Sequence, residues 1–220
     1  MYFKRADSGG KLVPQLAKKP QRKDVLCVFA GLRPLAAPRK HAEEAKTKEI
    51  SRSHKLLASD SGLITITGGK WTTYRVMAEE TVNLAIKTRG LPHRPCTTRN
   101  LKIHGYRENP DRNNHLYIYG NDQDAIRQLQ ESNPENARKL HPKLDYTVAE
   151  VVWAVQKEMA CTIDDVLARR VRALYMDARA SIEMAPTVAS IMAKELGKDQ
   201  TWEEEQIREY SSLAKNYCLS

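Results

Sequence analysis

The sequence has 220 residues, of which 41% are hydrophobic and 29% charged, which suffices for one or two domains with a real core and excludes wholesale disorder. No apolar run approaches the roughly 20 residues that span a bilayer, and residues 1–15 lack the apolar stretch of a secretory signal peptide. The formal net charge is +9, and residues 1–55 carry all of it, with 14 basic and 5 acidic residues. This basic segment is either a solvated leader or a surface for an anionic substrate, membrane or nucleic acid.

The cysteines are few and far apart: Cys27, Cys96, Cys161 and Cys218. No CxxC pair or Cys/His cluster occurs, so the sequence predicts neither a zinc site nor a disulfide scaffold, and no residue is assigned as a metal ligand. This cysteine usage fits a reducing compartment best.

Short β-rich runs and one helical pattern make up the first half of the chain. The predicted elements are strands at residues 24–30, 55–58, 63–67 and 101–104, a turn at 59–62 and a helix at 74–88. Within that helix, Ala78, Val82, Ala85 and Ile86 recur at the spacing of a buried stripe. The segment Arg89–Pro92 is expected to end it.

Residues 120–220 contain start and stop signals for a series of helices. The predicted helices are one capped by Asn121 or Asp122 and ending at Ser132, a short one opened by Pro134, and four at residues 147–159, 162–174, 187–196 and 202–217. Thr147 and Glu150 have the spacing of a capping box, and Thr162 begins a weaker repeat of that signal. Pro186 is expected to open the fifth of these helices and Gly197 to end it. This half therefore predicts an α-helical bundle.

The strongest chemical signal is the segment Gly68–Arg75, which reads GGKWTTYR between a predicted strand and a predicted helix. Glycines allow a ligand close to the backbone, and the free N–H groups of a helix N-terminus together with Lys70 favour an anion. The hydroxyls of Thr72 and Thr73 can cap the helix or bind the ligand. The segment is neither a Walker A loop nor a GxGxxG motif, and an ordinary strand-to-helix turn is the alternative interpretation.

Two arginines stand at the borders of predicted strands. Arg33, in the sequence GLRP, has a planar guanidinium that suits bidentate binding of phosphate or carboxylate, although a surface arginine in an ion pair is the alternative. Arg52, in the sequence SRSH, adds a second cation beside His54. Taken alone, His54 fits a structural role better than a catalytic one.

Taken in order, GLRPL, ISRSHKL, TGGKWTTYR and the long stretch LHPKLDYTVAEVVWAVQKEMACTIDDVLARRVRALYMDARA resemble the C-terminal half of FAD-dependent glycerol-3-phosphate dehydrogenases. The resemblance runs from about Asp24 to the C-terminus and is most specific between residues 140 and 186. Enzymes of that family oxidise sn-glycerol 3-phosphate to dihydroxyacetone phosphate. Hydride passes from C2 of the substrate to the flavin, and the electrons continue to membrane quinone, with oxygen as the alternative acceptor.

The resemblance assigns a role to each candidate residue. It implies that Arg33 and Arg52 bind the substrate phosphate and that Lys70 is the catalytic residue near the flavin and the substrate. The residues that it implies for FAD contact are Gly68, Gly69, Lys70, Thr72 and Thr73. Chemistry agrees, because two arginines and a lysine suit a small dianion, and a helix N-terminus suits the O2 edge of a reduced, anionic flavin.

The resemblance also bounds what this chain can do. The family begins with a Rossmann βαβ unit whose GxGxxG motif binds the ADP part of FAD, and this sequence has no such motif. We therefore expect a mainly α protein: residues 1–95 are an incomplete α/β remnant of the FAD/substrate-binding domain, and residues 96–220 are the α-helical C-terminal domain. This portion alone is expected to be inactive.

Partners and location follow from the resemblance as expectations. They are glycerol 3-phosphate, and quinone or the membrane surface for the intact enzyme, with a homo-oligomer as an alternative to a monomer. The expected location is cytoplasmic and peripheral to the inner face of the membrane. A non-catalytic helical module for subunit or membrane-surface contact is the alternative function. A nucleic-acid partner is not expected, because no RNP, helix-turn-helix or zinc-finger pattern accompanies the basic leader.

Overall fold

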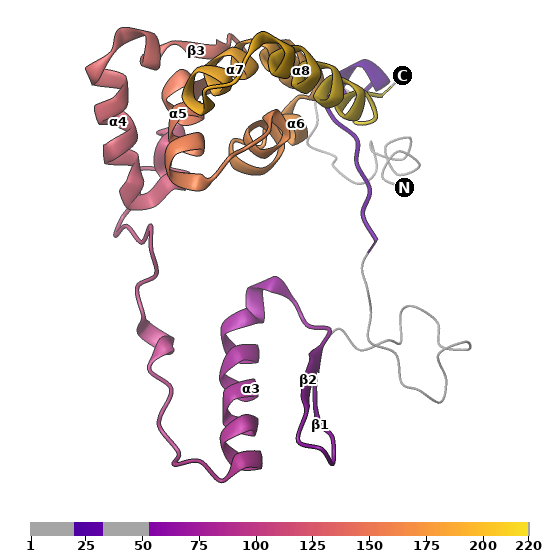
Figure 1. The fold of residues 1–220 in the computed structure, drawn as a ribbon, viewed down its shortest axis with the longest axis vertical. Helices are drawn as coiled ribbons and strands as arrows, with labels where there is room; N and C mark the ends of the chain where they lie inside the picture. The colour runs from indigo at the N-terminus through magenta and orange to yellow at the C-terminus, as the bar shows by residue number, and fades with distance from the viewer. Residues whose placement is uncertain (1–19, 33–52, 220) are drawn as a thin grey trace. The chain divides into compact units, whose positions relative to one another are not determined.

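The computed structural model describes residues 20–32 and 53–219, and they fall into two compact units (Figure 1). The helical unit contains the described residues 20–30 and 105–219, and the hairpin unit contains 31–32 and 53–104. Helices dominate, which confirms the predicted fold class. The compact units do not coincide with the predicted domains 1–95 and 96–220, and that domain division stays a prediction.

In the hairpin unit, two short strands precede one long helix. Its elements are β1 (Lys55–Ala58), β2 (Ile64–Thr67), the 3₁₀ helix η2 (Trp71–Thr73), α3 (Tyr74–Arg89) and the 3₁₀ helix η3 (Thr98–Asn100). β1 and β2 pair in antiparallel register, with Leu56 opposite Ile66. The turn between them closes where the Gly62 N–H donates to the Ser59 carbonyl over 2.8 Å. These elements confirm the two predicted strands, the turn and the helix, and Gly90 ends α3 at a φ of 61°, as expected.

The face that α3 turns inward differs from the predicted one. Ala78 and Val82 are exposed, with 56% of Val82 accessible. The half-buried positions of α3 are Arg75, Met77, Glu79, Thr81, Leu84, Ala85 and Ile86. The predicted stripe was therefore wrong at its first two positions, because the inward face includes Met77 and Thr81. No residue of β1, β2 or α3 is fully buried among the residues described in this unit.

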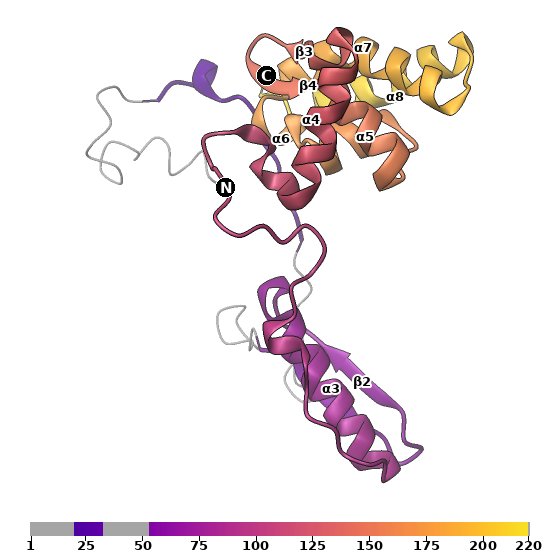
Figure 2. The same ribbon diagram turned by 90° about the vertical axis from the view of Figure 1, so that its left-hand side faces the viewer.

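The helical unit is built from one short hairpin and a set of helices (Figures 1 and 2). Its elements are the 3₁₀ helices η1 (Arg22–Asp24), η4 (His115–Asp122) and η5 (Pro134–Ala137), the strands β3 (Lys139–His141) and β4 (Leu144–Thr147), the π-helical turn η6 (Asp165–Arg170), and the α-helices α4 (Gln123–Ser132), α5 (Val148–Glu158), α6 (Ala173–Met176), α7 (Ala178–Leu196) and α8 (Gln200–Lys215). α7 is the central helix, because α5, α6 and α8 all pack against it.

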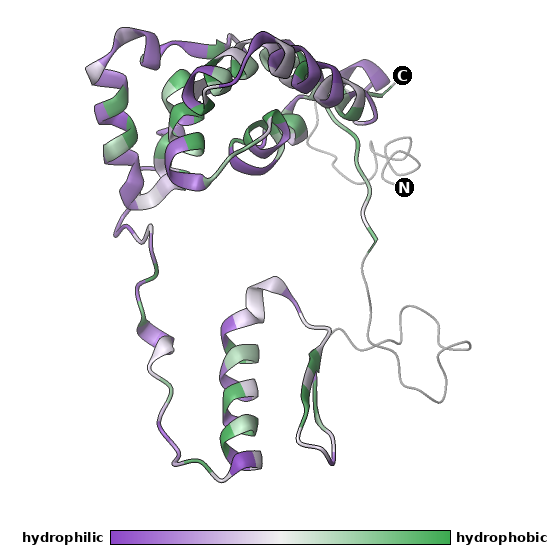
Figure 3. Cartoon of the chain, in the orientation of Figure 1, coloured by the Kyte–Doolittle hydropathy of each residue, from purple (hydrophilic) through white to green (hydrophobic). Residues whose placement is uncertain are grey.

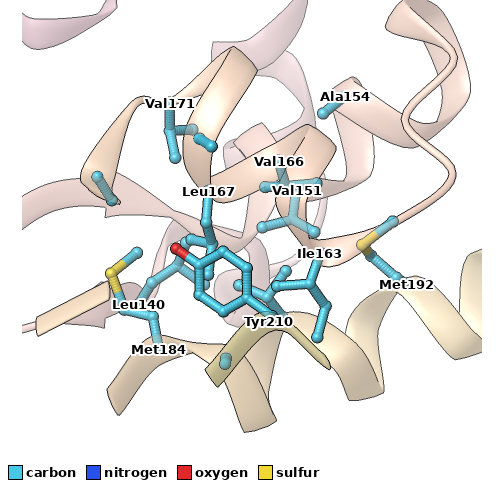
Figure 4. Close-up of a cluster of buried hydrophobic side chains, with 14 of the residues drawn as sticks. Leu140, Val151, Ala154, Ile163, Val166, Leu167, Val171, Met184, Met192 and Tyr210 are labelled. Carbon is cyan, nitrogen blue, oxygen red and sulfur yellow. The ribbon is translucent and has the colours of Figure 1, made fainter. Parts of the chain in front are cut away.

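A continuous hydrophobic core joins these helices (Figure 4). Its largest fully buried side chains include Val151 of α5, Ile163, Leu167 of η6, and Met184 and Met192 of α7. In Figure 3, α5 is coloured mostly hydrophobic, while α4 and α8 show mixed hydrophobic and hydrophilic colours. Burying a side chain of this size contributes about 1.5–3 kcal/mol, so this core is the main source of stability in the unit.

Most predicted helix ends are confirmed. The Thr147–Glu150 capping box is present at the start of α5. The second box is reciprocal, since the Thr162 N–H donates to the Asp165 carboxylate at 3.0 Å and the Asp165 N–H donates to the Thr162 hydroxyl at 3.2 Å. Gly197 ends α7 at a φ of 64°.

Other local predictions were wrong. Pro186 does not open a helix but lies inside α7, which starts eight residues earlier under an Asp177 side-chain cap. Residues 24–30 and 101–104 form no ladder, so neither is a strand. A proline can lie within a helix that has an extensive packed face, because packing offsets the one missing N–H bond.

A fully buried carboxylate ties three segments of the helical unit together. Glu150 is 0% exposed and accepts hydrogen bonds from His115 Nε2 at 3.0 Å, the Tyr119 hydroxyl at 3.1 Å and the Thr147 backbone N–H at 2.7 Å. The Thr147 hydroxyl is a fourth neighbour at 3.2 Å. The cluster therefore fixes η4, β4 and the first turn of α5 against one another.

Removing this carboxylate should destabilise the protein strongly. We expect Glu150→Ala to lower the free energy of unfolding by about 3–5 kcal/mol, because four donors lose their acceptor inside the protein. The matched control is Glu183→Ala, since Glu183 also contacts a histidine, His141, at 2.8 Å but has a side chain that is 64% exposed. That variant should lose about 0–1 kcal/mol. Urea unfolding measures both, and equal losses would contradict the structural role of Glu150.

The same cluster should make stability depend on pH. The hydrogen bond that His115 donates to Glu150 is the largest cause that raises the pKa of His115. Burial and the charge of Lys139 lower this pKa, while the charges of Glu150 and Asp145 raise it. Because the folded pKa lies above the unfolded one, the stabilisation is complete below the unfolded pKa of about 6.5 and is lost as pH rises through the folded pKa.

We therefore expect His115→Gln to lower the free energy of unfolding more at about pH 6 than at about pH 9, as measured by urea titration at both values. His93→Gln, a change at an exposed histidine, should show no such difference. A His115→Gln effect that does not change with pH would mean that the histidine contributes packing alone.

Candidate functional site

The glycine pair after β2 adopts a backbone conformation that other residues rarely take. Gly68 has a φ of 76° and Gly69 a φ of 86°. A Cβ atom on Gly69 would lie 2.7 Å from the Met77 sulfur and 3.1 Å from the His54 Cβ. Gly69 is thus both conformationally required and tightly packed between α3 and the residue before β1. The loop that the sequence singled out is held in a defined shape.

A 3₁₀ turn leads from this loop into α3. The Thr73 N–H and the Thr73 hydroxyl both donate to the Lys70 carbonyl, at 3.0 Å and 2.9 Å. The Thr73 hydroxyl therefore closes the turn and does not cap α3, whose first turn has neither a side-chain cap nor an acidic residue. The start of α3 thus keeps the positive end of its dipole uncompensated, which is the electrostatic setting that favours an anion.

Lys70 and an aromatic pair lie at this helix start. Lys70 is exposed, and its ammonium makes no ion pair with any residue in the described ranges. Trp71 stacks on Tyr74 with ring centroids 5.4 Å apart, and Trp71 is 85% exposed. A cation, a hydroxyl at Thr72 and a flat apolar surface therefore adjoin one another at the N-terminal end of α3.

Two side chains near the Gly68–Thr73 loop are held by contacts with α3. His54 bonds Glu80 of α3 at 2.6 Å, which agrees with the structural role expected for this histidine. Arg75 bonds Glu79 at 2.7 Å and reaches the Thr98 hydroxyl at 3.4 Å, so it fastens the following segment to α3. Sequence reasoning missed the Arg75 anchor, although its i,i+4 pairing with Glu79 was visible in the sequence.

The predicted site residues are only partly placed. Gly68, Gly69, Lys70, Thr72 and Thr73 come together in one loop, as adjacency in the chain requires. Arg33 and Arg52 lie outside the described residues, so their approach to Lys70 stays a prediction. In the described part of the chain, no group of three or more His, Cys, Asp or Glu side chains is arranged to hold a metal ion. Within residues 20–32 and 53–219, no helix has the length and apolarity needed to cross a membrane.

In the comparison with known proteins, one family match covers both the Gly68–Thr73 loop and most of the helical unit. The model of the family described as the C-terminal domain of alpha-glycerophosphate oxidase matches residues 64–203, from β2 into α8. A probable mitochondrial glycerol-3-phosphate dehydrogenase of Caenorhabditis elegans is 37% identical over 201 residues, which cover 80% of this chain and 27% of that protein. The mitochondrial glycerol-3-phosphate dehydrogenases of Bos taurus and Homo sapiens are each 35% identical over 210 residues, covering 85% of this chain and 28% of theirs.

The chain thus spans little more than a quarter of the length of these three relatives. The matched region includes the Gly68–Thr73 loop together with most of the helical core. Because the family model covers well over half of the sequence, the chain belongs to the family of the C-terminal domain of alpha-glycerophosphate oxidase.

Proposed function

We propose that this chain is the C-terminal portion of a flavoprotein that oxidises sn-glycerol 3-phosphate to dihydroxyacetone phosphate. The observation that carries the proposal is the family match, which runs from β2 through the Gly68–Thr73 loop to α8. The relatives named above carry the name glycerol-3-phosphate dehydrogenase. An oxidoreductase of glycerol metabolism is therefore the function class that these findings favour.

The residues of the loop fit one edge of a flavin. Gly69 leaves no room for a Cβ on its packed side, and the uncapped start of α3 offers positive potential with Lys70 beside it. Gly68, Gly69, Lys70, Thr72 and Thr73 would hold this edge of FAD, while the dinucleotide motif for the ADP part is not in this sequence. FAD, when bound, accepts the hydride from C2 of the substrate and passes the electrons on, with membrane quinone as the proposed acceptor.

The cationic residues of this chain would have two separate roles, which are binding of the substrate phosphate and stabilisation of charge at the reacting centre. Arg33 and Arg52 bind the phosphate dianion through charge-assisted hydrogen bonds and orient C2. Lys70 and the helix start stabilise negative charge that develops at the edge they face. The cations thus act on the phosphate and on the reacting centre separately, and this separation can be measured in the kinetics.

Partners and location are part of the same proposal. Glycerol 3-phosphate is the proposed substrate, the membrane surface a proposed peripheral contact, and a homo-oligomer the proposed alternative to a monomer. Because the named relatives are mitochondrial proteins, we propose that the protein is located in the mitochondrion if its cell has mitochondria. In a cell without mitochondria, we propose that it is located in the cytoplasm, at the inner face of the membrane.

The decisive experiment uses variants of the intact enzyme that contains this chain. Arg33→Ala or Arg52→Ala should raise KM for glycerol 3-phosphate about ten- to a hundredfold, because a lost charge-assisted contact is worth roughly 1.5–3 kcal/mol. Lys70→Ala should lower kcat more than it raises KM, since its charge acts on the transition state. Lys87→Ala, at the exposed far end of α3, is the matched control and should change neither.

Glycerol in place of glycerol 3-phosphate tests the assignment further. Without the phosphate, wild type and the two arginine variants should differ little. If the arginine variants lose equal activity on glycerol, these arginines are structural and the phosphate assignment is wrong. An intact protein that purifies without visible flavin absorbance and without activity would instead favour the non-catalytic helical module.

A further inference from the structure

The N-terminal residues of the helical unit lie against its C-terminal end. The Val28 N–H donates to the Tyr217 carbonyl over 2.8 Å. The guanidinium of Arg179 bridges the same two segments. It donates to the Val25 carbonyl at 3.4 Å, three residues before Val28, and to the Leu219 carbonyl at 3.0 Å, two residues after Tyr217. Residues 25–28 and 217–219 therefore lie side by side and run in opposite directions.

This antiparallel order places Cys27 opposite Cys218. The hydrogen bond joins the peptide group between Cys27 and Val28 to the peptide group between Tyr217 and Cys218. A disulfide needs Cα atoms about 4.4–6.8 Å apart, and the hydrogen bond between these two peptide groups brings the Cα atoms of Cys27 and Cys218 toward that range.

The side chains also share one environment. Cys27 and Cys218 are both half-buried, and both pack against the same hydrophobic core. Burial raises the pKa of the Cys27 thiol, and the neighbouring groups of Cys218 and Asp177 add to that shift. The Cys218 thiol donates a hydrogen bond to the Ala214 carbonyl at 3.7 Å, which is a weak hydrogen bond that reorientation breaks easily.

We propose that Cys27 and Cys218 form an oxidisable pair that becomes an intramolecular disulfide by exchange with a low-molecular-weight disulfide such as oxidised glutathione. One thiolate attacks a sulfur of oxidised glutathione and releases one glutathione. The second thiolate then attacks the resulting mixed disulfide and releases the other glutathione. Two protein thiols are oxidised, one glutathione disulfide is reduced to two thiols, and the two protons end on the released glutathiones.

The cross-link would join the two ends of the helical unit. Residues 25–28 lead directly to residue 31, where the hairpin unit begins, and residues 217–219 follow α8. The segment also holds the start of α7, since the Ala178 N–H donates to the Leu26 carbonyl at 3.0 Å. Oxidation would thus fix the chain entering the hairpin unit to the central helix and to α8 at once.

The test uses the full chain with Cys96→Ser and Cys161→Ser, which leaves only the proposed pair. After treatment with oxidised glutathione, the number of titratable thiols should fall from two to none. The mass of the protein should fall by two hydrogens, with no glutathione added. Trypsin should then release residues 24–39 joined to residues 216–220, because Pro34 blocks cleavage after Arg33. The reaction should accelerate from about pH 7 to about pH 9, as expected when burial raises a thiol pKa.

Thermal unfolding provides an independent readout. The oxidised protein should melt about 5–15 °C higher than the reduced one, and dithiothreitol should reverse the shift. Adding Cys218→Ser to the same background should abolish both the shift and the linked peptide. In the wild-type chain, the exposed Cys161 reports that the oxidant is active. If Cys161 takes up glutathione while Cys27 and Cys218 stay unlinked, or each keeps a glutathione, the proposal is wrong.

Discussion

The buried carboxylate of Glu150 is the constraint on which the helical unit depends. It caps the helix that it belongs to and, through His115 and Tyr119, also holds η4, which is more than thirty residues away in the sequence. A carboxylate without solvent is costly unless its oxygens are hydrogen-bonded, and here four donors supply that compensation. Local helix initiation and long-range packing thus rely on the same atoms, so α5 can start only where the tertiary structure is also satisfied. This coupling fixes the start of α5 relative to η4 and β4.

The two units contrast in how they are held together. The helical unit has a continuous core and closed helix ends, while the hairpin unit leaves Leu57, Leu63 and Val82 more than half exposed. Two strands and one helix bury too little apolar surface to be strongly stable on their own. The Gly68–Thr73 loop therefore belongs to the less stable unit, and its shape rests on local contacts at Gly69 and Thr73. A loop on such an element can change its shape at small cost in free energy.

Sequence reasoning succeeded where a structure is decided by neighbouring residues. Both capping boxes, the αL glycine after α7, and the two strands and turn within residues 55–67 were predicted, because caps and turns depend on residues within four positions. It failed where tertiary contacts decide. Pro186 is a local signal for a helix start, yet the packing of α7 keeps the helix continuous across it. Residues 24–30 have the composition of a strand but pair with no strand among the described residues. Pairs such as His115 with Glu150, and Cys27 with Cys218, leave no periodic signal in one sequence. For the site, the loop was predicted correctly as a strand-to-helix connection, whereas the approach of Arg33 and Arg52 depends on the fold beyond it.

The placement of the tryptophans gives each unit its own optical signal. The sequence contains three, and Trp71 lies almost fully in water at the start of α3, stacked on Tyr74. Trp153 and Trp202 both belong to the helical unit, where the indole nitrogen of Trp153 is buried beside Glu158. Emission from Trp71 is therefore red-shifted and open to quenching by an aromatic ring that settles beside Lys70. Emission from Trp153 is blue-shifted and reports whether the helical core is intact. The red side of the fluorescence spectrum is therefore weighted toward the start of α3, and the blue side toward the helical core.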